Sequence, residues 1–241
     1  MISIIIPAYN EELRIEKTLR NVLHFPFWSS VGLELIVVDD ASKDKTPKIV
    51  ETFMCDYPCV KLLRGEVNRG KGFSVRRGMQ EAQGDYLFFV DADGSTPIEE
   101  IQKLLPLVMS GVCDIAIGSR GLKESDVRIK QNWVRQSMGK VFNLFVRFSL
   151  LKEFRDTQCG FKCFSKKAAK AVFPLQRVNR FAFDVELLVI ATAKGFHIKE
   201  VPVVWLNSPQ SKVNPLKDST IMFFDLFRIK ANLLKGLYNK A

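Results

Sequence analysis

The chain has 241 residues, of which 47% are hydrophobic and 26% are charged. These values exclude a disordered or fibrous chain and are typical of a soluble globular protein with room for one large α/β domain or two small ones. No apolar stretch approaches the ~18 uninterrupted residues of a membrane-spanning helix.

The net charge of +10 is unevenly distributed along the chain. Residues 1–120 carry 14 Lys and Arg against 17 Asp and Glu, whereas residues 121–241 carry 22 against 9. A basic second half predicts an anionic partner there, such as a phosphate group or an anionic membrane.

The five cysteines do not form a disulfide framework or a zinc motif. Their odd number and low density favour reduced thiols and therefore a cytosolic chain. The opening residues, MISIIIPAYNEE, turn acidic at once and lack the basic start of a secretory signal. We therefore expect a cytoplasmic location.

The first half alternates predicted strands with predicted helices. Asn10 is expected to cap the first helix, and Thr46 followed by Pro47 is a favourable helix start. The strands are expected within residues 2–10, 33–42, 60–64, 85–94 and 114–120, and the helices within 11–23, from Thr46-Pro47 onward, and within 70–84 and 96–111. Because these strands are apolar throughout rather than alternating, they predict a mostly parallel sheet with helices on both faces.

The second half is less regular but shows no linker, repeat or low-complexity tract. We expect helices at residues 131–152, 165–173, 183–195 and 218–240, with strands at 159–164 and 197–206. The two halves are therefore expected to share one sheet, as a single Rossmann-like α/β domain.

Two aspartates end the predicted strand FFVDADGS. Asp91 and Asp93 are two residues apart, so strand periodicity points both carboxylates to the same side. Hard oxygen ligands in that arrangement suit Mg²⁺ or Mn²⁺, which take few carboxylates and complete their coordination with substrate phosphates. The motif predicts a metal and diphosphate site.

Other predicted strand ends carry polar residues that would meet the same ligand. In a parallel sheet, ligands bind beyond the carboxyl ends of the strands. Of the adjacent Asp39 and Asp40, one can face the ligand. Tyr9 offers a ring for stacking on a base. Lys71, between two glycines, is either a phosphate contact or a solvated lysine, because the fragment is not a full dinucleotide or P-loop fingerprint.

Several segments together resemble family 2 glycosyltransferases of the GT-A fold. These are IIIPAYNEE, LIVVDDASKDKT, NRGKGFSVRRGMQEAQGDYLFFVDADGST and IAIGSR. In the second half, WVRQSMGKVFNLF, RDTQCGFKCF, FAFDVELL and VPVVWLNSPQSKV resemble the dolichyl-phosphate β-glucosyltransferases and the related dolichol-phosphate mannosyltransferases. The resemblance covers nearly the whole chain and keeps its order.

The resemblance implies transfer of one hexose, with inversion, from a nucleotide diphosphate sugar to a polyprenyl or dolichyl phosphate. It implies that residues 1–120 bind the nucleotide sugar and that residues 121–241 bind the acceptor. The implied metal ligands are Asp91 and Asp93, the implied nucleotide contacts are Pro7, Tyr9, Glu11 and Asp40, and the implied phosphate contacts are Arg120, Arg135 and Lys212.

The identity of the sugar rests on finer features of the same segments. NRGKG, RDTQCGFK and FAFDVELL are more similar to the glucosyl branch, so UDP-glucose is the first expected donor and GDP-mannose the second. The mannosyl relatives carry a glutamine where this chain has Ser95, and the third metal ligand stays open. Glucosyl members from eukaryotes carry an N-terminal span that residues 1–241 do not show.

The acceptor phosphate needs cationic positioning rather than a strong base, because its second pKa is about 6. Arginine is suited to bidentate phosphate contact, which favours Arg120 and Arg135. The predicted helices at 134–152 and 218–240 each combine a narrow polar seam with a wide apolar face, as an interfacial helix does. We expect a peripheral protein on the cytoplasmic side of a membrane, or, alternatively, two helices that only pack on the sheet.

Three other functions are weighed against this one. FFVDADGST also matches the opening motif of haloacid-dehalogenase-type phosphatases, although that motif normally lies on the first strand. Transfer to a soluble or polysaccharide acceptor would need Asp156, Asp184 or Glu186 as a general base. No aromatic and basic recognition motif supports a nucleic-acid partner.

Overall fold

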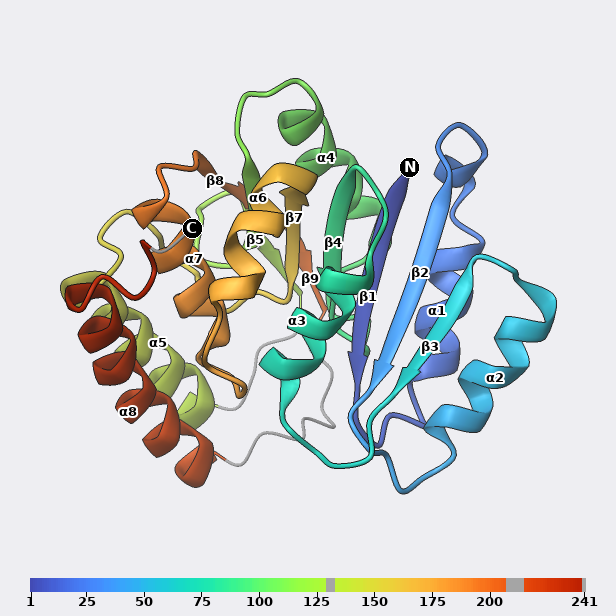
Figure 1. The fold of residues 1–241 in the computed structure, drawn as a ribbon, viewed down its shortest axis with the longest axis horizontal. Coiled ribbons are helices and arrows are strands. Elements are labelled where there is room, and N and C mark those ends of the chain that lie inside the picture. The colour runs from blue at the N-terminus through green and yellow to red at the C-terminus, as the bar shows by residue number, and fades with distance from the viewer. Residues whose placement is uncertain (129–132, 207–214, 240–241) are drawn as a thin grey trace.

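The computed structural model describes residues 1–128, 133–206 and 215–239, and a seven-stranded sheet crosses its centre (Figure 1). The strands are β1 (Ile2–Ala8), β2 (Leu33–Asp39), β3 (Val60–Arg64), β4 (Tyr86–Val90), β5 (Ile115–Ser119), β7 (Phe161–Ser165) and β8 (Ile198–Pro202). Their order is β3-β2-β1-β4-β7-β5-β8, and β6 (Asp126–Val127) pairs separately with β9 (Val204–Trp205). Every pairing is parallel except those of β7, which runs antiparallel to β4 and β5.

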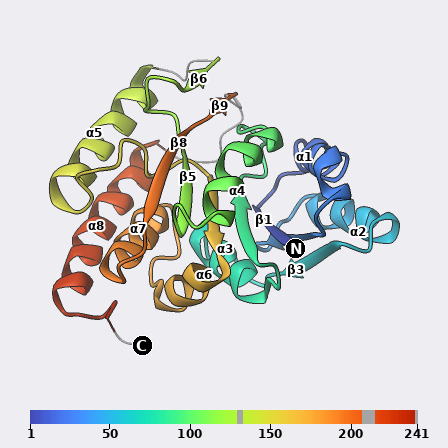
Figure 2. The same ribbon diagram turned by 90° about the horizontal axis from the view of Figure 1, so that it is seen from above.

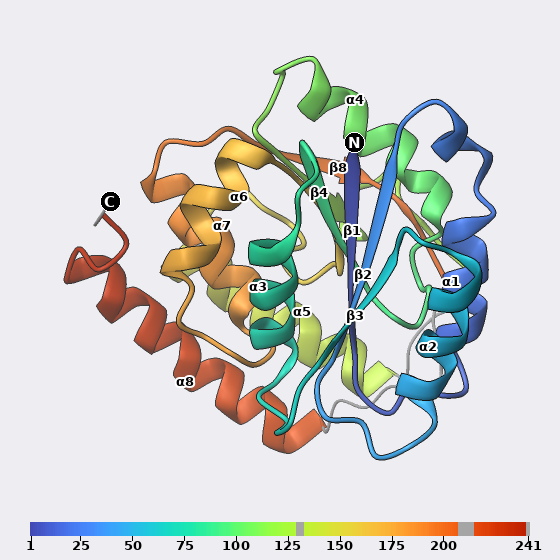
Figure 3. The same cartoon turned by 45° about the vertical axis from the view of Figure 1, so that its right-hand side comes forward.

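Helices cover both faces of this sheet (Figure 3). They are α1 (Ile15–Leu23), α2 (Thr46–Asp56), α3 (Lys71–Glu81), α4 (Ile101–Met109), α5 (Trp133–Ser149), α6 (Lys166–Val172), α7 (Phe183–Ala193) and α8 (Pro215–Leu234), with 3-10 turns at Pro26–Ser29, Ile98–Glu100 and Phe173–Leu175. One core cluster joins α3, α5, α6, α7 and α8 to the sheet, and the other joins α1, α2 and α4 to it. Consecutive residues of β1 enter opposite clusters, Ile4 one and Ile5 the other, as the alternation of side chains along a strand requires.

The prediction of one shared sheet is confirmed, because β7 and β8 come from the second half and β7 lies next to β4. The helices α5 and α8 pack on each other at one end of the sheet, whereas α1 and α2 lie at the other (Figure 2). No helix in the described ranges combines the length and apolarity that crossing a bilayer requires.

The strand β1 passes through Pro7. The proline is tolerated because the pairing with β4 ends at Ile5, so no hydrogen bond is required from the nitrogen of Pro7. Two local predictions are wrong in detail. Asn10 does not cap a helix: its φ is +55° and α1 begins only at Ile15. The strand expected at 197–206 is divided at Val203 into β8 and β9.

Candidate active site

Asp91 lies directly after β4, at the edge where the carboxyl ends of the parallel strands meet. Its amide donates a hydrogen bond to the carbonyl oxygen of Gly160, at 3.1 Å. A β-carbon added at Gly160 would lie 2.1 Å from Oδ2 of Asp91, so the carboxylate rests against bare backbone. Gly160 therefore makes room for the carboxylate, as glycine does where chain and polar group approach closely.

Asp93 is presented by a tight turn after Asp91. Gly94 has a φ of +62°, and the amide of Ser95 donates to Oδ1 of Asp93 at 2.9 Å. Oδ2 of Asp93 lies 3.9 Å from Nη1 of Arg14. The side chains of Asp91 and Asp93 are 33% and 26% exposed, so both remain accessible to a ligand.

The two carboxylates fit a divalent metal that arrives with its substrate. The described residues contain no group of three or more His, Cys, Asp or Glu side chains placed to hold an ion. Two partly exposed carboxylate donors suit Mg²⁺ or Mn²⁺, which use few protein ligands and take the others from phosphate oxygens and water. Asp91 and Asp93 therefore remain the predicted metal ligands.

Lys71, the first residue of α3, reaches the same carboxylate. Its Nζ lies 2.5 Å from Oδ1 of Asp91 and 5.9 Å from the centre of the Phe183 ring. Burial alone would lower the pKa of Lys71, but the charge of Asp91, aided by Asp184, raises the pKa above its ordinary value. Lys71 therefore stays positively charged within the site.

Asp40 holds the loop that carries Lys71. Its two carboxylate oxygens accept hydrogen bonds from the amides of Arg69 and Gly70, at 2.9 and 2.7 Å. Gly70 has a φ of +102°, and a β-carbon there would lie 2.6 Å from the carbonyl oxygen of Asn179. Asp40, which is distant in the sequence, and Gly70 therefore determine where α3 begins.

The expected base and ribose contacts Pro7, Tyr9 and Glu11 lie in and after the end of β1. Tyr9 and Glu11 are half-buried, and the carboxylate of Glu11 forms an ion pair with Arg14 at 2.5 Å. The amide of Glu11 donates to the hydroxyl of Thr46 at 2.7 Å. This hydrogen bond joins the start of α2 to the chain after β1, close to Asp91 and Asp93.

Arg120, at the end of β5, is held by Asp156. Its Nε and Nη2 donate to the two carboxylate oxygens of Asp156 at 2.6 and 2.9 Å, and its own amide adds a third bond at 3.0 Å. Burial alone would raise the pKa of Asp156, but the Arg120 guanidinium lowers it to about 2. The guanidinium is also 5.4 Å from the centre of the Trp205 ring. The N–H groups of Arg120 that are not bonded to Asp156 could donate hydrogen bonds to an anion.

A buried ion pair beneath the site was missed from the sequence. Lys162, in the middle of β7, is fully buried and donates to Asp184 at 2.5 Å and to the carbonyl oxygen of Cys159 at 2.6 Å. Burial raises the pKa of Asp184, although Lys162 and Lys71 oppose it. A lysine inside the apolar run GFKCF was the available signal, because buried charges are normally paired.

Two predicted phosphate contacts cannot be placed in this site. Arg135 lies in the first turn of α5, and its side chain lies outside the described part of the structure. Lys212 falls within 207–214, outside the described residues.

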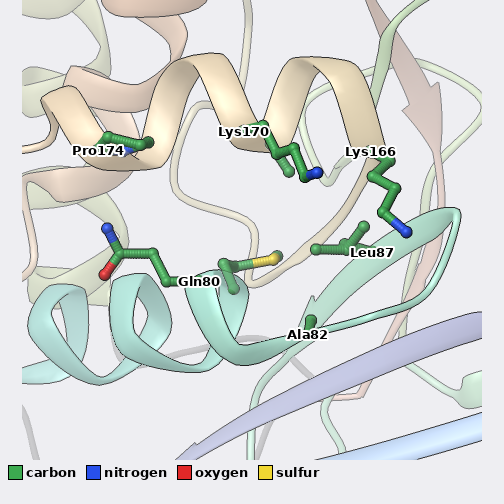
Figure 4. Close-up of a pocket in the computed structure, with 8 residues that line it drawn as sticks. Gln80, Ala82, Leu87, Lys166, Lys170 and Pro174 are labelled. Atoms are coloured by element: carbon green, nitrogen blue, oxygen red, sulfur yellow. The ribbon is translucent and has the colours of Figure 1, made fainter.

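A separate pocket of about 170 Å³ lies between α3 and α6 (Figure 4). It is lined by apolar side chains together with Gln80, Lys166 and Lys170. Leu87, near the start of β4, borders it, whereas Asp91 follows the other end of that strand. This pocket is therefore not part of the site described above.

Solved structures share this fold at low sequence identity. A glucosyl-3-phosphoglycerate synthase from Mycobacterium tuberculosis, in complex with Mn²⁺, UDP-glucose and phosphoglyceric acid, aligns with a TM-score of 0.70 at 18% identity, over 96% of this chain and 80% of that chain. TarS from S. aureus aligns with a TM-score of 0.62 at 20% identity, over 95% of this chain and 64% of that one. These similarities confirm the predicted GT-A fold.

Sequence relatives match nearly the whole chain. A dolichyl-phosphate beta-glucosyltransferase from Dictyostelium discoideum is 35% identical over 98% of this chain and 76% of its own length. Proteins of the same name from Drosophila melanogaster and Homo sapiens are 36% and 34% identical, over 100% and 98% of this chain and 77% of their own lengths. The model of glycosyl transferase family 2 matches residues 3–173. The chain belongs to glycosyl transferase family 2.

Proposed function

We propose that this enzyme transfers glucose, with inversion, from UDP-glucose to a polyprenyl or dolichyl phosphate at the cytoplasmic surface of a membrane. The observation that carries the proposal is the similarity, at 34–36% identity and over nearly the full chain, to proteins named dolichyl-phosphate beta-glucosyltransferase. Membership of glycosyl transferase family 2 supports a glycosyltransferase against the phosphatase that the motif FFVDADGST also suggested.

The nucleotide sugar would bind to the first half of the chain. Pro7, Tyr9 and Glu11 would contact the base and ribose, Asp40 would act at the nucleotide and through the loop that it holds, and Lys71 would meet the diphosphate. Asp91 and Asp93 would hold Mg²⁺ or Mn²⁺. The bound ion would neutralise the charge that develops on the leaving diphosphate.

The acceptor phosphate would lie against the second half, with Arg120, Arg135 and Lys212 as its cationic contacts. A phosphate monoester is largely ionised at neutral pH, so its oxygen can attack the anomeric carbon without a strong base. That bond forms on the face opposite the diphosphate as the bond to the diphosphate breaks, which inverts the anomeric configuration. The contact between Arg120 and Asp156 supports the proposed role of Arg120, because three hydrogen bonds hold the guanidinium at the end of β5.

The test is a panel of radiolabelled UDP- and GDP-sugars, each with polyprenyl phosphate and with Mn²⁺, Mg²⁺ or excess chelator. We expect a lipid-extractable glucose product from UDP-glucose with either metal and none with chelator. A product from GDP-mannose alone would overturn the choice of donor but not the reaction. Full activity in chelator would remove the metal role.

A labelled product that stays in the aqueous phase would contradict the lipid acceptor. Asp156, Asp184 and Glu186 would then be compared as general bases. Asp156 is the least suited of the three, because its oxygens accept from the guanidinium and the amide of Arg120, which lower its pKa to about 2.

A further inference from the structure

The ion pair between Lys71 and Asp91 places a positive charge on one of the two proposed metal ligands. The Nζ–Oδ1 distance of 2.5 Å is that of a direct, charge-assisted hydrogen bond. The side chains of Lys71 and Asp91 are only 22% and 33% exposed, so water screens the pair less than it screens a surface pair. Asp91 is thus neutralised within the protein itself.

The surroundings of Lys71 direct its ammonium towards acids. A β-carbon at Gly72 would lie 2.6 Å from Cβ of Phe183, so the start of α3 packs directly on the start of α7. Asp184 and Asp93 add to the attraction that Asp91 exerts on Lys71. Asp184 is in turn paired with the buried Lys162, which keeps it at the base of the site. The flexible stem of a lysine leaves the ammonium free to move over a few ångströms while α3 stays fixed.

We infer that Lys71 is an internal counter-ion of the metal site, which competes with a divalent cation for Asp91 until a nucleotide diphosphate gives the ammonium another partner. The inference rests on the proposed function, because it assumes that metal and diphosphate meet at Asp91 and Asp93. Without nucleotide, a metal must displace Lys71 and therefore binds weakly. With nucleotide, the ammonium pairs with phosphate oxygens and both carboxylates are released to the metal.

The inference has a thermodynamic consequence for both ligands. If the diphosphate strengthens metal binding by removing Lys71 from Asp91, the metal must strengthen diphosphate binding by the same factor. A nucleotide that coordinates the metal itself also produces such coupling. The distinguishing quantity is therefore the metal affinity of the nucleotide-free enzyme, on which Lys71 acts alone.

The test measures Mn²⁺ binding to the intact chain by the electron paramagnetic resonance of free Mn²⁺, without and with UDP. Lys71→Met should bind Mn²⁺ without UDP at least about fivefold more tightly than wild type, the lower end of typical coupling between ligand sites. Lys71→Arg keeps the charge and should bind as wild type does. Adding Asp91→Asn to Lys71→Met should abolish the gain.

Lys103→Met is the matched control, because Lys103 pairs with Glu100 at 2.7 Å away from the aspartates and its loss changes the net charge equally. Its Mn²⁺ affinity should equal that of wild type. Circular dichroism verifies folding, and Lys71→Gln, which keeps a polar end, replaces Lys71→Met if the latter does not fold.

The outcomes separate this inference from the proposed function. Equal or weaker nucleotide-free Mn²⁺ binding by the charge-removing Lys71 variant overturns the counter-ion role, even if wild type binds Mn²⁺ with UDP. Absence of Mn²⁺ binding to wild type with saturating UDP instead overturns the proposed metal site itself, and this inference with it.

Discussion

Single residues decide where the two candidate metal-binding carboxylates of this enzyme lie. Asp91 is placed as much by the absence of a side chain at Gly160 as by its own position after β4, because its carboxylate occupies the space of the missing β-carbon. Gly160 lies 69 residues later in the chain, so the sequence gives no direct sign that the two residues meet. The same holds for Arg120 and Asp156, which form their pair across 36 residues.

Gly160→Ala is expected to displace the carboxylate of Asp91 while leaving the fold largely intact. A shift of about 1 Å in such a group can lower turnover about 100-fold, and we expect a loss of that order together with weaker Mn²⁺ binding in the presence of UDP. Radiolabel transfer and Mn²⁺ titration would measure the two effects.

Gly139→Ala is the control for that substitution. Apart from the neighbouring backbone of α5 itself, no described atom lies within 4 Å of its added β-carbon, and alanine inside α5 is favoured over glycine by about 1 kcal/mol. It should keep its activity and unfold at an equal or higher temperature. Wild-type turnover by Gly160→Ala would show that Asp91 need not occupy this position.

At the level of elements, the sequence predicted most helices and strands because their signals are local. The apolar runs of β1, β2 and β4 and the Thr46-Pro47 start of α2 depend only on near neighbours. The direction of β7 does not depend on near neighbours in the sequence, because a five-residue apolar run has the same pattern in either direction. Its antiparallel direction is defined by its pairing with β4 and β5. Asn10 is a residue type that often caps helix N-termini, but its Oδ1 accepts a hydrogen bond from the amide of Lys43 instead.

The candidate site was predictable where strand ends carry acids, and not where partners come from distant elements. Asp91, Asp93 and Asp40 were found because polar residues follow apolar strands. The pair Lys162–Asp184 joins β7 to α7, and the role of Asp40 in binding the amides of Arg69 and Gly70 depends on a loop 30 residues away. Such contacts follow from the topology of the sheet, which the local pattern does not contain.

A buried hydrogen bond links the chain after α8 to α7. The hydroxyl of Tyr238 donates to Oε1 of Glu186 at 2.7 Å, and both side chains are fully buried. Tyr238→Phe keeps the ring but leaves a buried carboxylate with fewer partners, so we expect a loss of about 1–3 kcal/mol in unfolding free energy. Urea unfolding would measure it, and hydrogen exchange should increase first in α8.

Tyr57→Phe is the matched control for that prediction. The Tyr57 hydroxyl lies 3.0 Å from Nε2 of His24 at an exposed position, so its loss should change stability by no more than about 0.5 kcal/mol. An equal effect of the two substitutions would show that the Tyr238 bond does not fasten α8.

At the scale of the whole molecule, charge and apolar surface gather on the side formed by α5 and α8. The two helices meet through the rings of Phe142, Phe145 and Phe223, which pack edge to face. Phe148 and Phe224 instead point outward and are 79% and 70% exposed. Exposed aromatic side chains of this size are costly in water and mark an interaction surface when they occur together.

The other exposed residues of this side show which surface it suits. Val141, Leu144, Phe227 and Leu234 extend its apolar part, and Arg147, Arg228 and Lys230 are exposed on the same helices. Both helices begin on the side of the molecule towards which the carboxyl ends of β1 and β2 point (Figure 1). A bilayer with anionic lipid matches this combination, and it would hold the phosphate of a polyprenyl acceptor on the same side as Asp91 and Arg120.

We therefore expect the protein to sediment with anionic vesicles at low salt and to be partly released by salt, because screening weakens the basic contribution and leaves the apolar one. Replacing Phe148 and Phe224 together with serine should weaken vesicle binding about tenfold or more, since each buried phenylalanine contributes on the order of 2 kcal/mol. Turnover with polyprenyl phosphate should fall in parallel, while the affinity for UDP stays unchanged. Replacing Met109 and Val112, which are also apolar and exposed but lie in and just after the end of α4, should change none of these quantities. Phe145 is left intact, because its ring packs against Phe223 and Phe227 and its loss would disturb the pairing of the two helices. Wild-type vesicle binding by the Phe148 and Phe224 variant would contradict the membrane role of α5 and α8, and the basic residues alone would then account for any attraction to the membrane.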